Sequence, residues 1–200
     1  NDIQAITYDN ARLWVCTRDS LFTYNRVEDR LDYYYNLEGV RMSCVTEDSA
    51  GNLYVGTMNN GLYMIDHNKK WLNYFPKKDI TCIYEDSKKS IWVGTKDDGL
   101  FRLDRNGGIT NYGTAPHQNM LSSSYVRCVV EDNLGNYWIG TFKGLDKLDV
   151  TTGTFTHYSK DNKPYSLSNS SIICMMKDRQ GTFWIGTYYG GVNLFNPDYE

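Results

Sequence analysis

A phrase of four residues occurs five times along the chain, and it restricts the possible folds more than any other feature. Each copy consists of an aromatic residue, a β-branched residue, a glycine (a cysteine in the first copy) and a threonine. The threonines are 40, 38, 46 and 46 residues apart. A period of about 40 residues built from strand-type residues is typical of β-propeller blades. The copies are Trp14–Thr17, Tyr54–Thr57, Trp92–Thr95, Trp138–Thr141 and Trp184–Thr187.

The sequence around each phrase predicts a blade of four antiparallel strands. An apolar strand that ends in an acidic turn precedes the phrase, as in Val126–Asp132. A turn closing on Gly-Leu or Gly-Val follows it, and two further strands come after that turn, the last one rich in aromatics, as in Trp71–Phe75. Strands rich in Val, Ile, Thr, Tyr and Trp alternate with Gly, Asn, Asp and Ser, which is typical of a β-meander. No segment shows a sustained helical period, so we expect almost no helix.

The fold class expected is therefore all-β, as a β-propeller fragment of five consecutive four-stranded antiparallel blades. We number the strands of a blade from first to fourth, from the propeller axis outward. The chain starts directly in a first strand, without Met, and stops after the third strand of the fifth blade, so we expect part of a larger propeller whose last blade is incomplete. The whole chain is a single propeller array, with blades at about 1–39, 40–79, 80–125, 126–171 and 172–200.

Each repeated residue type has a mechanical role in such a blade. The aromatic fills the layer between adjacent blades, where a large flat side chain covers much surface. The glycine two residues later lies on the same face and leaves room for a neighbouring side chain. The acidic turn ends in Asp, which can accept bonds from the backbone two residues on. The glycine before the third strand supplies a positive φ in its hairpin.

Composition narrows the possible partners. The net charge is −3, and the 21 Lys and Arg residues are scattered, so no basic stripe indicates binding to nucleic acid. No apolar run reaches about 18 residues, so we expect no membrane contact in this chain. We also expect no secretory signal within these residues.

Four cysteines occupy one repeat position, each 13 residues before its threonine, and Ala5 holds that position in the first blade. Such a position favours a small, weakly polar side chain. Equivalent first-strand positions on adjacent blades are expected to lie further apart than the roughly 4.4–6.8 Å between Cα atoms that a disulfide needs. We therefore expect buried, unpaired thiols at Cys44, Cys82, Cys128 and Cys174.

No pattern of catalytic or metal-binding residues emerges. The three histidines, His67, His117 and His157, occupy different places in their repeats, so they predict no shared metal site. Glu-Asp pairs such as Glu131-Asp132 recur in several blades, which indicates turns rather than a general acid and base. We predict no catalytic residue, no metal and no cofactor.

The loops at one end of the blades vary, and variable loops on a repeat frame are common binding sites. That end carries the turns between second and third strands and the connections between blades. Stacking and hydrogen-bonding side chains there make the candidate ligand-binding set, although solvated loops are an equally simple interpretation. Arg127 interrupts an apolar strand, and its alternative role is as a solvated channel residue or as one member of an ion pair with a neighbouring blade. The set is Arg18, Arg41, Asn59, Asn60, Lys96, Arg127, Phe142, Lys143, Tyr188 and Tyr189.

The segment from Glu131-Asp132 to Gly144-Leu145 resembles the two-component regulator propeller repeat, and the second, third and fifth copies match at most positions. The connector Asn162–Asn169 is similar to connectors between such repeats. The resemblance implies the periplasmic, extracytoplasmic sensor region of a Bacteroides-type hybrid two-component histidine kinase.

Further implications of the resemblance are an oligosaccharide ligand derived from glycans, signalling to transcription, and a homodimeric intact receptor. The partners it implies within the same protein are the remaining blades and downstream sensor domains. Two alternatives stay open: a propeller enzyme that acts on polysaccharide as a lyase or glycosidase, and a protein–protein interaction scaffold.

Overall fold

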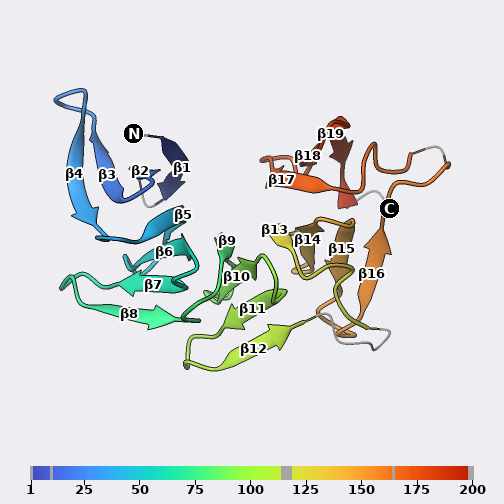
Figure 1. Ribbon diagram of the computed structural model, residues 1–200. Coiled ribbons are helices and arrows are strands. Elements are labelled where there is room, and N and C mark those ends of the chain that lie inside the picture. The colour runs from blue at the N-terminus through green and yellow to red at the C-terminus, as the bar shows by residue number, and fades with distance from the viewer. Residues whose placement is uncertain (1, 10, 114–118, 164, 198–200) are drawn as a thin grey trace. The chain divides into compact units, whose positions relative to one another are not determined.

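The computed structural model describes residues 2–9, 11–113, 119–163 and 165–197, and these contain nineteen β-strands and no helix. The strands form five antiparallel sheets, which are the five predicted propeller blades (Figure 1). The fold prediction is confirmed, including the fifth blade, which has three strands among the described residues.

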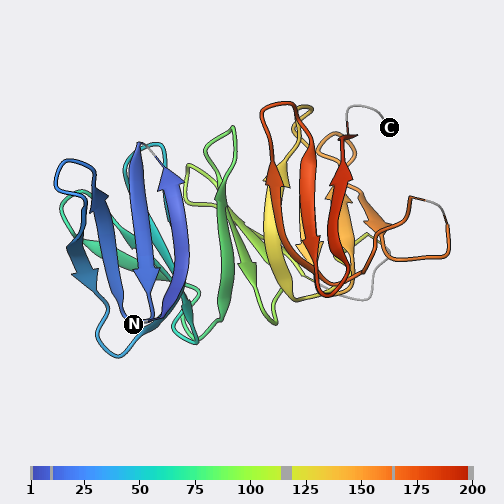
Figure 2. The same ribbon diagram turned by 90° about the horizontal axis from the view of Figure 1, so that it is seen from above.

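Within each sheet the strands follow one another in sequence order, as expected for a meander. Blade 1 contains β1 (Ile3–Asp9), β2 (Arg12–Thr17), β3 (Ser20–Asn25) and β4 (Arg30–Asn36), and blade 2 contains β5 (Arg41–Glu47), β6 (Leu53–Met58), β7 (Leu62–Ile65) and β8 (Trp71–Tyr74). Blade 3 contains β9 (Ile80–Glu85), β10 (Ile91–Thr95), β11 (Leu100–Leu103) and β12 (Ile109–Tyr112). Blade 4 contains β13 (Val126–Glu131), β14 (Tyr137–Thr141), β15 (Leu145–Leu148) and β16 (Phe155–Tyr158). Blade 5 contains β17 (Ile172–Lys177), β18 (Phe183–Thr187) and β19 (Gly191–Phe195), whose neighbouring ribbons are clear in Figure 2.

The chain divides into two compact units, residues 1–83 and 84–200, which are described separately. In the first unit β1 and β2 pack against β5, and in the second β13 and β14 pack against β17. Within each unit these neighbouring blades therefore contact each other through the first strand of the later blade, as expected for the strands nearest a propeller axis.

The hydrophobic core lies between blades. Trp14 packs with Val45 and Leu53 of the next blade, and Trp138 packs with Phe183 and Ile185 of the next blade. The repeated aromatic therefore fills the layer between blades, as predicted. Trp184 of blade 5 has the same position but is 44% exposed, because no described residue covers that face.

The predicted Asp turns are present. Asp132 Oδ1 accepts the backbone N–H of Leu134 at 2.9 Å and of Asn136 at 2.8 Å, and Asp48 and Asp178 make equivalent turns. The second carboxylate oxygen of Asp132 accepts the indole N–H of Trp138 at 3.0 Å. Asp178 accepts the indole N–H of Trp184 in the same way, at 3.0 Å, so in blades 4 and 5 the Asp joins the turn to the aromatic of its own blade.

The hairpin glycines follow the prediction except in blade 4. Gly61, Gly99 and Gly191 have φ of +86°, +79° and +78°. Gly144 is not among the residues with positive φ, so the prediction is wrong there. The physical reason is turn length: the hydroxyl of Thr141 donates to the carbonyl of Gly144, three residues on, whereas in blade 2 Thr57 reaches Gly61, four residues on. The shorter turn closes without the left-handed residue.

On adjacent strands, three cysteines lie directly opposite the repeated glycines. Cys44 lies opposite Gly56, Cys128 opposite Gly140 and Cys174 opposite Gly186. A Cβ added to Gly56 or Gly140 would collide with the sulfur of its cysteine and with an isoleucine of the next blade, Ile80 or Ile172. The glycine therefore leaves the space for neighbouring side chains that the sequence predicted.

The prediction of buried thiols is only partly correct. Cys16, Cys44, Cys128 and Cys174 are free thiols, but Cys44, Cys82 and Cys128 are half-buried and Cys174 is exposed. Cys174 lies on blade 5, where no described neighbour covers the glycine side of the sheet. Burial raises the pKa of the thiols of Cys44 to about 11 and of Cys128 to about 12.

Candidate functional site

The connections between blades meet the turns between second and third strands at one end of each blade. In blade 4 the N–H of Phe142 donates to the carbonyl of Tyr125 at 3.0 Å. In blade 5 the N–H of Tyr188 donates to the carbonyl of Ser171 at 2.9 Å. We call this end of the blades the loop end, and it carries every predicted ligand-binding residue.

Arg127 is the centre of an aromatic cluster at the loop end of blade 4. Its guanidinium carbon lies 4.5 Å from the ring centroid of Tyr125 and 5.4 Å from that of Phe142. The two rings are nearly parallel, at 12°, with centroids 6.3 Å apart. A guanidinium against aromatic faces gains cation–π attraction. The cluster is open to solvent, since Phe142 is 52% exposed.

Arg127 also reaches the neighbouring blade. Its Nη1 donates to the hydroxyl of Ser171 and to the carbonyl of Ile172, both at 3.0 Å. The equivalent residue of blade 2 is Ser43, whose hydroxyl donates to the carbonyl of Ile80 at 2.6 Å. Arg127 therefore does contact the neighbouring blade, but through hydrogen bonds to neutral groups and not through the ion pair considered as its alternative role, and blade 2 makes the same contact with a serine.

Tyr188 and Tyr189 extend the aromatic surface from blade 5. Their ring centroids are 4.3 Å apart, and the rings are 52% and 91% exposed. Tyr189 has φ of +58°, a conformation that costs a bulky residue energy. Ser171 connects the two parts of the surface, because it accepts from Arg127 and bonds Tyr188.

The structure brings together only part of the predicted set. Arg127, Phe142, Tyr188 and Tyr189 are joined by the contacts above, and Lys143 is exposed beside Phe142. Lys96 is exposed at the loop end of blade 3. Arg18, Arg41, Asn59 and Asn60 lie at the loop end of blades 1 and 2, in the other compact unit. Asn59 and Asn60 serve the turn itself, since the N–H of Asn59 donates to Asp79 and the carbonyl of Asn60 accepts from Asn73.

Sequence reasoning missed a polar network beneath the loop end of blade 4. Asp146 is fully buried, and its Oδ2 accepts from the backbone and hydroxyl of Ser122 at 2.8 and 2.9 Å. Its Oδ1 lies 2.8 Å from Nδ1 of His157. In blade 5 the side chain of Asn193 takes this place: its Oδ1 accepts the backbone N–H of Ser168 at 3.0 Å, and its Nδ2 donates to the hydroxyl of Ser168 at 2.9 Å. The signal in the sequence was the Leu-Ser pair shared by both long connections, and the network anchors those connections.

Tyr125 was missed as well, although it directly precedes a first strand at the loop end. His117, one of the histidines considered above, lies outside the described residues. Within the described ranges no group of three His, Cys, Asp or Glu residues is placed to hold a metal ion. In the same ranges no helix is long and apolar enough to cross a membrane.

The opposite end of the blades carries the Glu-Asp pairs, and their contacts are structural. Glu131 accepts the backbone N–H and the hydroxyl of Ser87, both at 2.7 Å, and so joins blade 4 to the turn of blade 3. The hydroxyl of Tyr137 donates to Asp86 at 2.8 Å. Burial, followed by this bond to a carboxylate, raises the pKa of Tyr137. These groups hold blades together.

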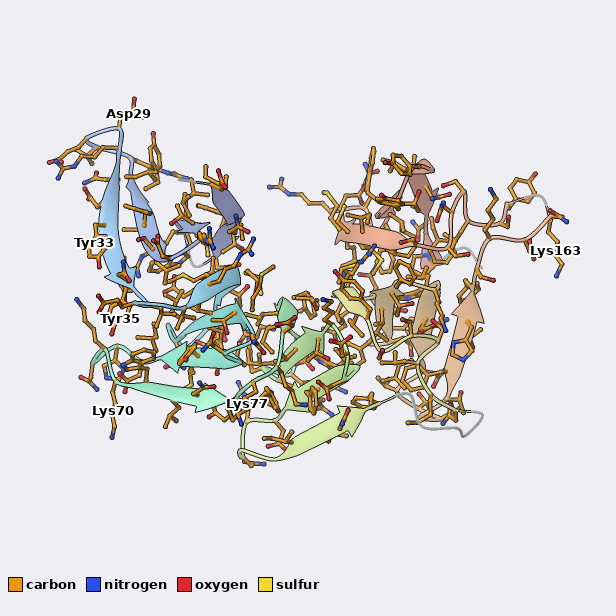
Figure 3. All side chains as sticks on the ribbon, viewed as in Figure 1. Asp29, Tyr33, Tyr35, Lys70, Lys77 and Lys163 are labelled. Carbon is orange, nitrogen blue, oxygen red and sulfur yellow. The ribbon has the colours of Figure 1, made fainter. Side chains whose placement is uncertain are left out.

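A hollow of about 720 Å³ lies on the outer side of blades 4 and 5, away from the aromatic cluster. Its walls include His157, Leu167, Asn193 and Phe195, and Lys163 projects from the adjoining loop (Figure 3). In blade 4 the equivalent edge of β15 is covered by β16. The hollow thus lies along the edge of β19, at the position that the fourth strand occupies in blade 4. We assign no ligand to it.

Comparisons with known proteins agree with the repeat pattern. Residues 74–97, 120–143 and 166–189 match the two component regulator propeller family. Each match runs from the end of one blade through the loop-end turn of the next. The resemblance inferred from the sequence is confirmed for these repeats. No curated protein matches the chain.

Solved structures similar to the chain include two extracellular domains and a lyase. The extracellular domain of a protein described as a hybrid two component system from B. thetaiotaomicron has 28% identity and a TM-score of 0.81, covering 97% of this chain and 26% of that one. The extracellular domain of a protein described as a one component system from the same organism has 23% identity and a TM-score of 0.79, covering 96% and 27%. Virginiamycin B lyase from Staphylococcus aureus has 16% identity and a TM-score of 0.71, covering 97% and 69%. The chain thus spans about a quarter of each of the two extracellular-domain structures.

Proposed function

We propose that the chain is a ligand-sensing module of an extracytoplasmic two-component sensor, and that it binds oligosaccharides derived from glycans without chemistry of its own. The observation that carries this proposal is the exposed cluster of Tyr125, Arg127, Phe142, Tyr188 and Tyr189 at the loop end. Sugars bind to flat aromatic faces that are flanked by hydrogen-bonding groups, and this cluster supplies both.

The similarity to a B. thetaiotaomicron extracellular domain over 97% of the chain supports the sensor role. On this proposal the periplasmic ligand signal passes to a histidine kinase and then to transcription. The remaining blades, downstream sensor domains and a second copy of the receptor are the protein partners. The likeness to the lyase is a likeness of fold and supplies no catalytic residue here.

The test is a binding titration of the full-length protein against a panel of oligosaccharides, with product analysis in the same samples. Phe142→Ala and Tyr188→Ala remove exposed rings at the loop end, and each should weaken binding about tenfold or more because a stacking face is lost. The matched control is Leu134→Ala, which removes an exposed apolar side chain at the opposite end. Appearance of cleaved products would indicate an enzyme, and binding of a protein but no sugar would indicate a scaffold.

A further inference from the structure

We propose that Arg127 recognises a carboxylate, so that the ligand of the loop end is an acidic oligosaccharide that contains a uronic acid. This inference rests on the proposed function, and it names the chemical class of the ligand. It rests on which of the five N–H groups of the Arg127 guanidinium already donate hydrogen bonds within the protein.

Among the described residues, Arg127 has hydrogen-bond partners for one of its three nitrogens. Nη1 donates to Ser171 Oγ and to the carbonyl of Ile172, which accounts for both of its hydrogens. In the part of the chain that the structure describes, no group accepts from Nε or Nη2. Neither atom is among the buried polar atoms that lack a partner, so both face solvent.

The unused edge has the shape of a carboxylate site. The N–H groups of Nε and Nη2 lie side by side in the guanidinium plane, and such a pair matches the two oxygens of a carboxylate in a bidentate bond. No carboxylate of the described residues pairs with Arg127, so its charge is available to a ligand. A bound carboxylate would also gain charge-assisted hydrogen bonds, which are stronger than neutral ones.

The guanidinium is held in place before any ligand arrives. The rings of Tyr125 and Phe142 contact it, and the two bonds from Nη1 fix its direction. A side chain that is already ordered loses little conformational entropy on binding. Exposed surface lysines lack this preorganisation.

The link between blades does not itself require an arginine. Ser43 makes the equivalent bond, to the carbonyl of Ile80, with a single hydroxyl. The remaining donors and the positive charge of Arg127 therefore exceed what the fold needs at this position. The exposed rings of Phe142 and Tyr188 lie on either side of the connection through Ser171, where sugar rings attached to the carboxylate would stack.

The serine of blade 2 supplies the test variant. Arg127→Ser should keep the fold while removing both the paired N–H groups of Nε and Nη2 and the positive charge. Arg127→Lys keeps the charge without the paired N–H groups. Arg105→Ser is the matched control, because it removes the same charge from an exposed turn at the opposite end of blade 3. Thermal unfolding of each variant, without ligand, checks that the blades remain intact.

Calorimetric titrations of the full-length protein should use trimers of galacturonate, glucuronate and mannuronate, together with their methyl esters and with neutral trimers. The expected result is that at least one acid trimer binds, and that its affinity falls about 10–100-fold on esterification and equally on Arg127→Ser. Arg127→Lys should give an intermediate loss, and Arg105→Ser should leave affinity unchanged. If the ester binds as tightly as the acid, or if Arg127→Ser binds as tightly as the original protein, the carboxylate proposal is overturned.

The titrations also separate this inference from the proposed function. Binding of neutral trimers that is lost in Phe142→Ala and kept in Arg127→Ser would support a sugar sensor and overturn the carboxylate. Binding of no sugar, acidic or neutral, would overturn both.

Discussion

At the scale of single residues, the blades conserve the combined volume of a cross-strand pair. Three blades carry cysteine on the first strand and glycine opposite it, as at Cys174 and Gly186, and blade 3 has Cys82 and Gly94 at the same repeat positions. Blade 1 reverses the sizes, with Ala5 opposite Cys16. One sulfur therefore occupies the pair in every blade, either from the first strand or from the second.

Changing both members of such a pair, so that it becomes the alanine–cysteine pair of blade 1, should therefore be tolerated better than placing a cysteine at the glycine position alone. Gly186→Cys places a side chain against the sulfur of Cys174 and should cost about 1–3 kcal/mol of unfolding free energy. Adding Cys174→Ala should restore most of that loss, because the pair then matches blade 1. Urea denaturation measures both.

The same exchange at Gly56 and Cys44 is the control, since a Cβ at Gly56 also meets Ile80 and recovery there should be incomplete. A double variant at positions 174 and 186 that is no more stable than Gly186→Cys would refute this account of the pair.

Three thiols, fully buried at Cys16 and half-buried at Cys44 and Cys128, should make the fold sensitive to alkali. Burial raises the pKa of Cys16 and of Cys128 from about 9 to about 12, and that of Cys44 to about 11. Above pH 9 these thiols ionise in the unfolded chain and stay protonated in the folded one, so the unfolded state binds fewer protons and stability falls as pH rises.

Each such thiol contributes a slope of up to about 1.4 kcal/mol per pH unit between pH 9 and its folded pKa, and no slope below pH 8. Urea midpoints from pH 7 to pH 11 measure the effect. Cys128→Ala should flatten the decline by about one thiol's share, and an unchanged decline would show that this sulfur is not protected.

At the scale of elements, one carboxylate links the turn between the first and second strands of blade 4 to the second strand. Asp132 is buried and accepts four N–H bonds, from Leu134, from the backbone and side chain of Asn136, and from the indole of Trp138. All four partners are donors, so an amide group cannot replace the carboxylate without placing N–H against N–H.

Asp132→Asn should therefore lower the unfolding free energy by about 2–3 kcal/mol, because at least one buried donor loses its partner. Asp178→Asn is the matched comparison, since Asp178 makes the same bond to Trp184 at the exposed face of blade 5. Chemical denaturation should show a clearly smaller loss there. Equal losses would mean that burial does not determine the strength of this link.

The strands, their order and the Asp turns could be predicted from sequence because they depend on local, repeated residues. The aromatic layer between blades could be predicted for the same reason, but the polar contacts between blades could not. The repeat shows that Glu131 recurs but not that it bonds Ser87 of the blade before, and it did not reveal the buried bond of Asp146 to Ser122. At the candidate site the sequence singled out Arg127, Phe142, Tyr188 and Tyr189, whereas Tyr125 and the sharing of Ser171 depend on how loops fold together.

At the scale of the whole molecule, blade 5 presents a face of the kind that other blades bury. Met176, Trp184 and Leu194 are exposed, whereas the equivalent Val130 and Trp138 of blade 4 are covered by blade 5. An apolar face of this kind favours association with another blade.

The isolated chain should therefore self-associate through blade 5, with an average mass that rises with concentration in sedimentation equilibrium. Trp184→Lys should reduce that association because it places a charge in the apolar row. Leu134→Lys, an equal change at an exposed turn, is the control. A chain that stays monomeric at all concentrations would contradict this use of the face.

The central claim is that the loop end of blades 4 and 5 is the ligand-binding surface, and hydrogen–deuterium exchange of the full-length protein tests it most directly. Exchange is compared with and without the tightest-binding oligosaccharide of the panel. We predict that protection concentrates in residues 122–127, 142–143, 168–172 and 188–191, with little change in the opposite turns at 86–90 and 132–136. Protection of those opposite turns, with the loop end unchanged, would contradict the claim.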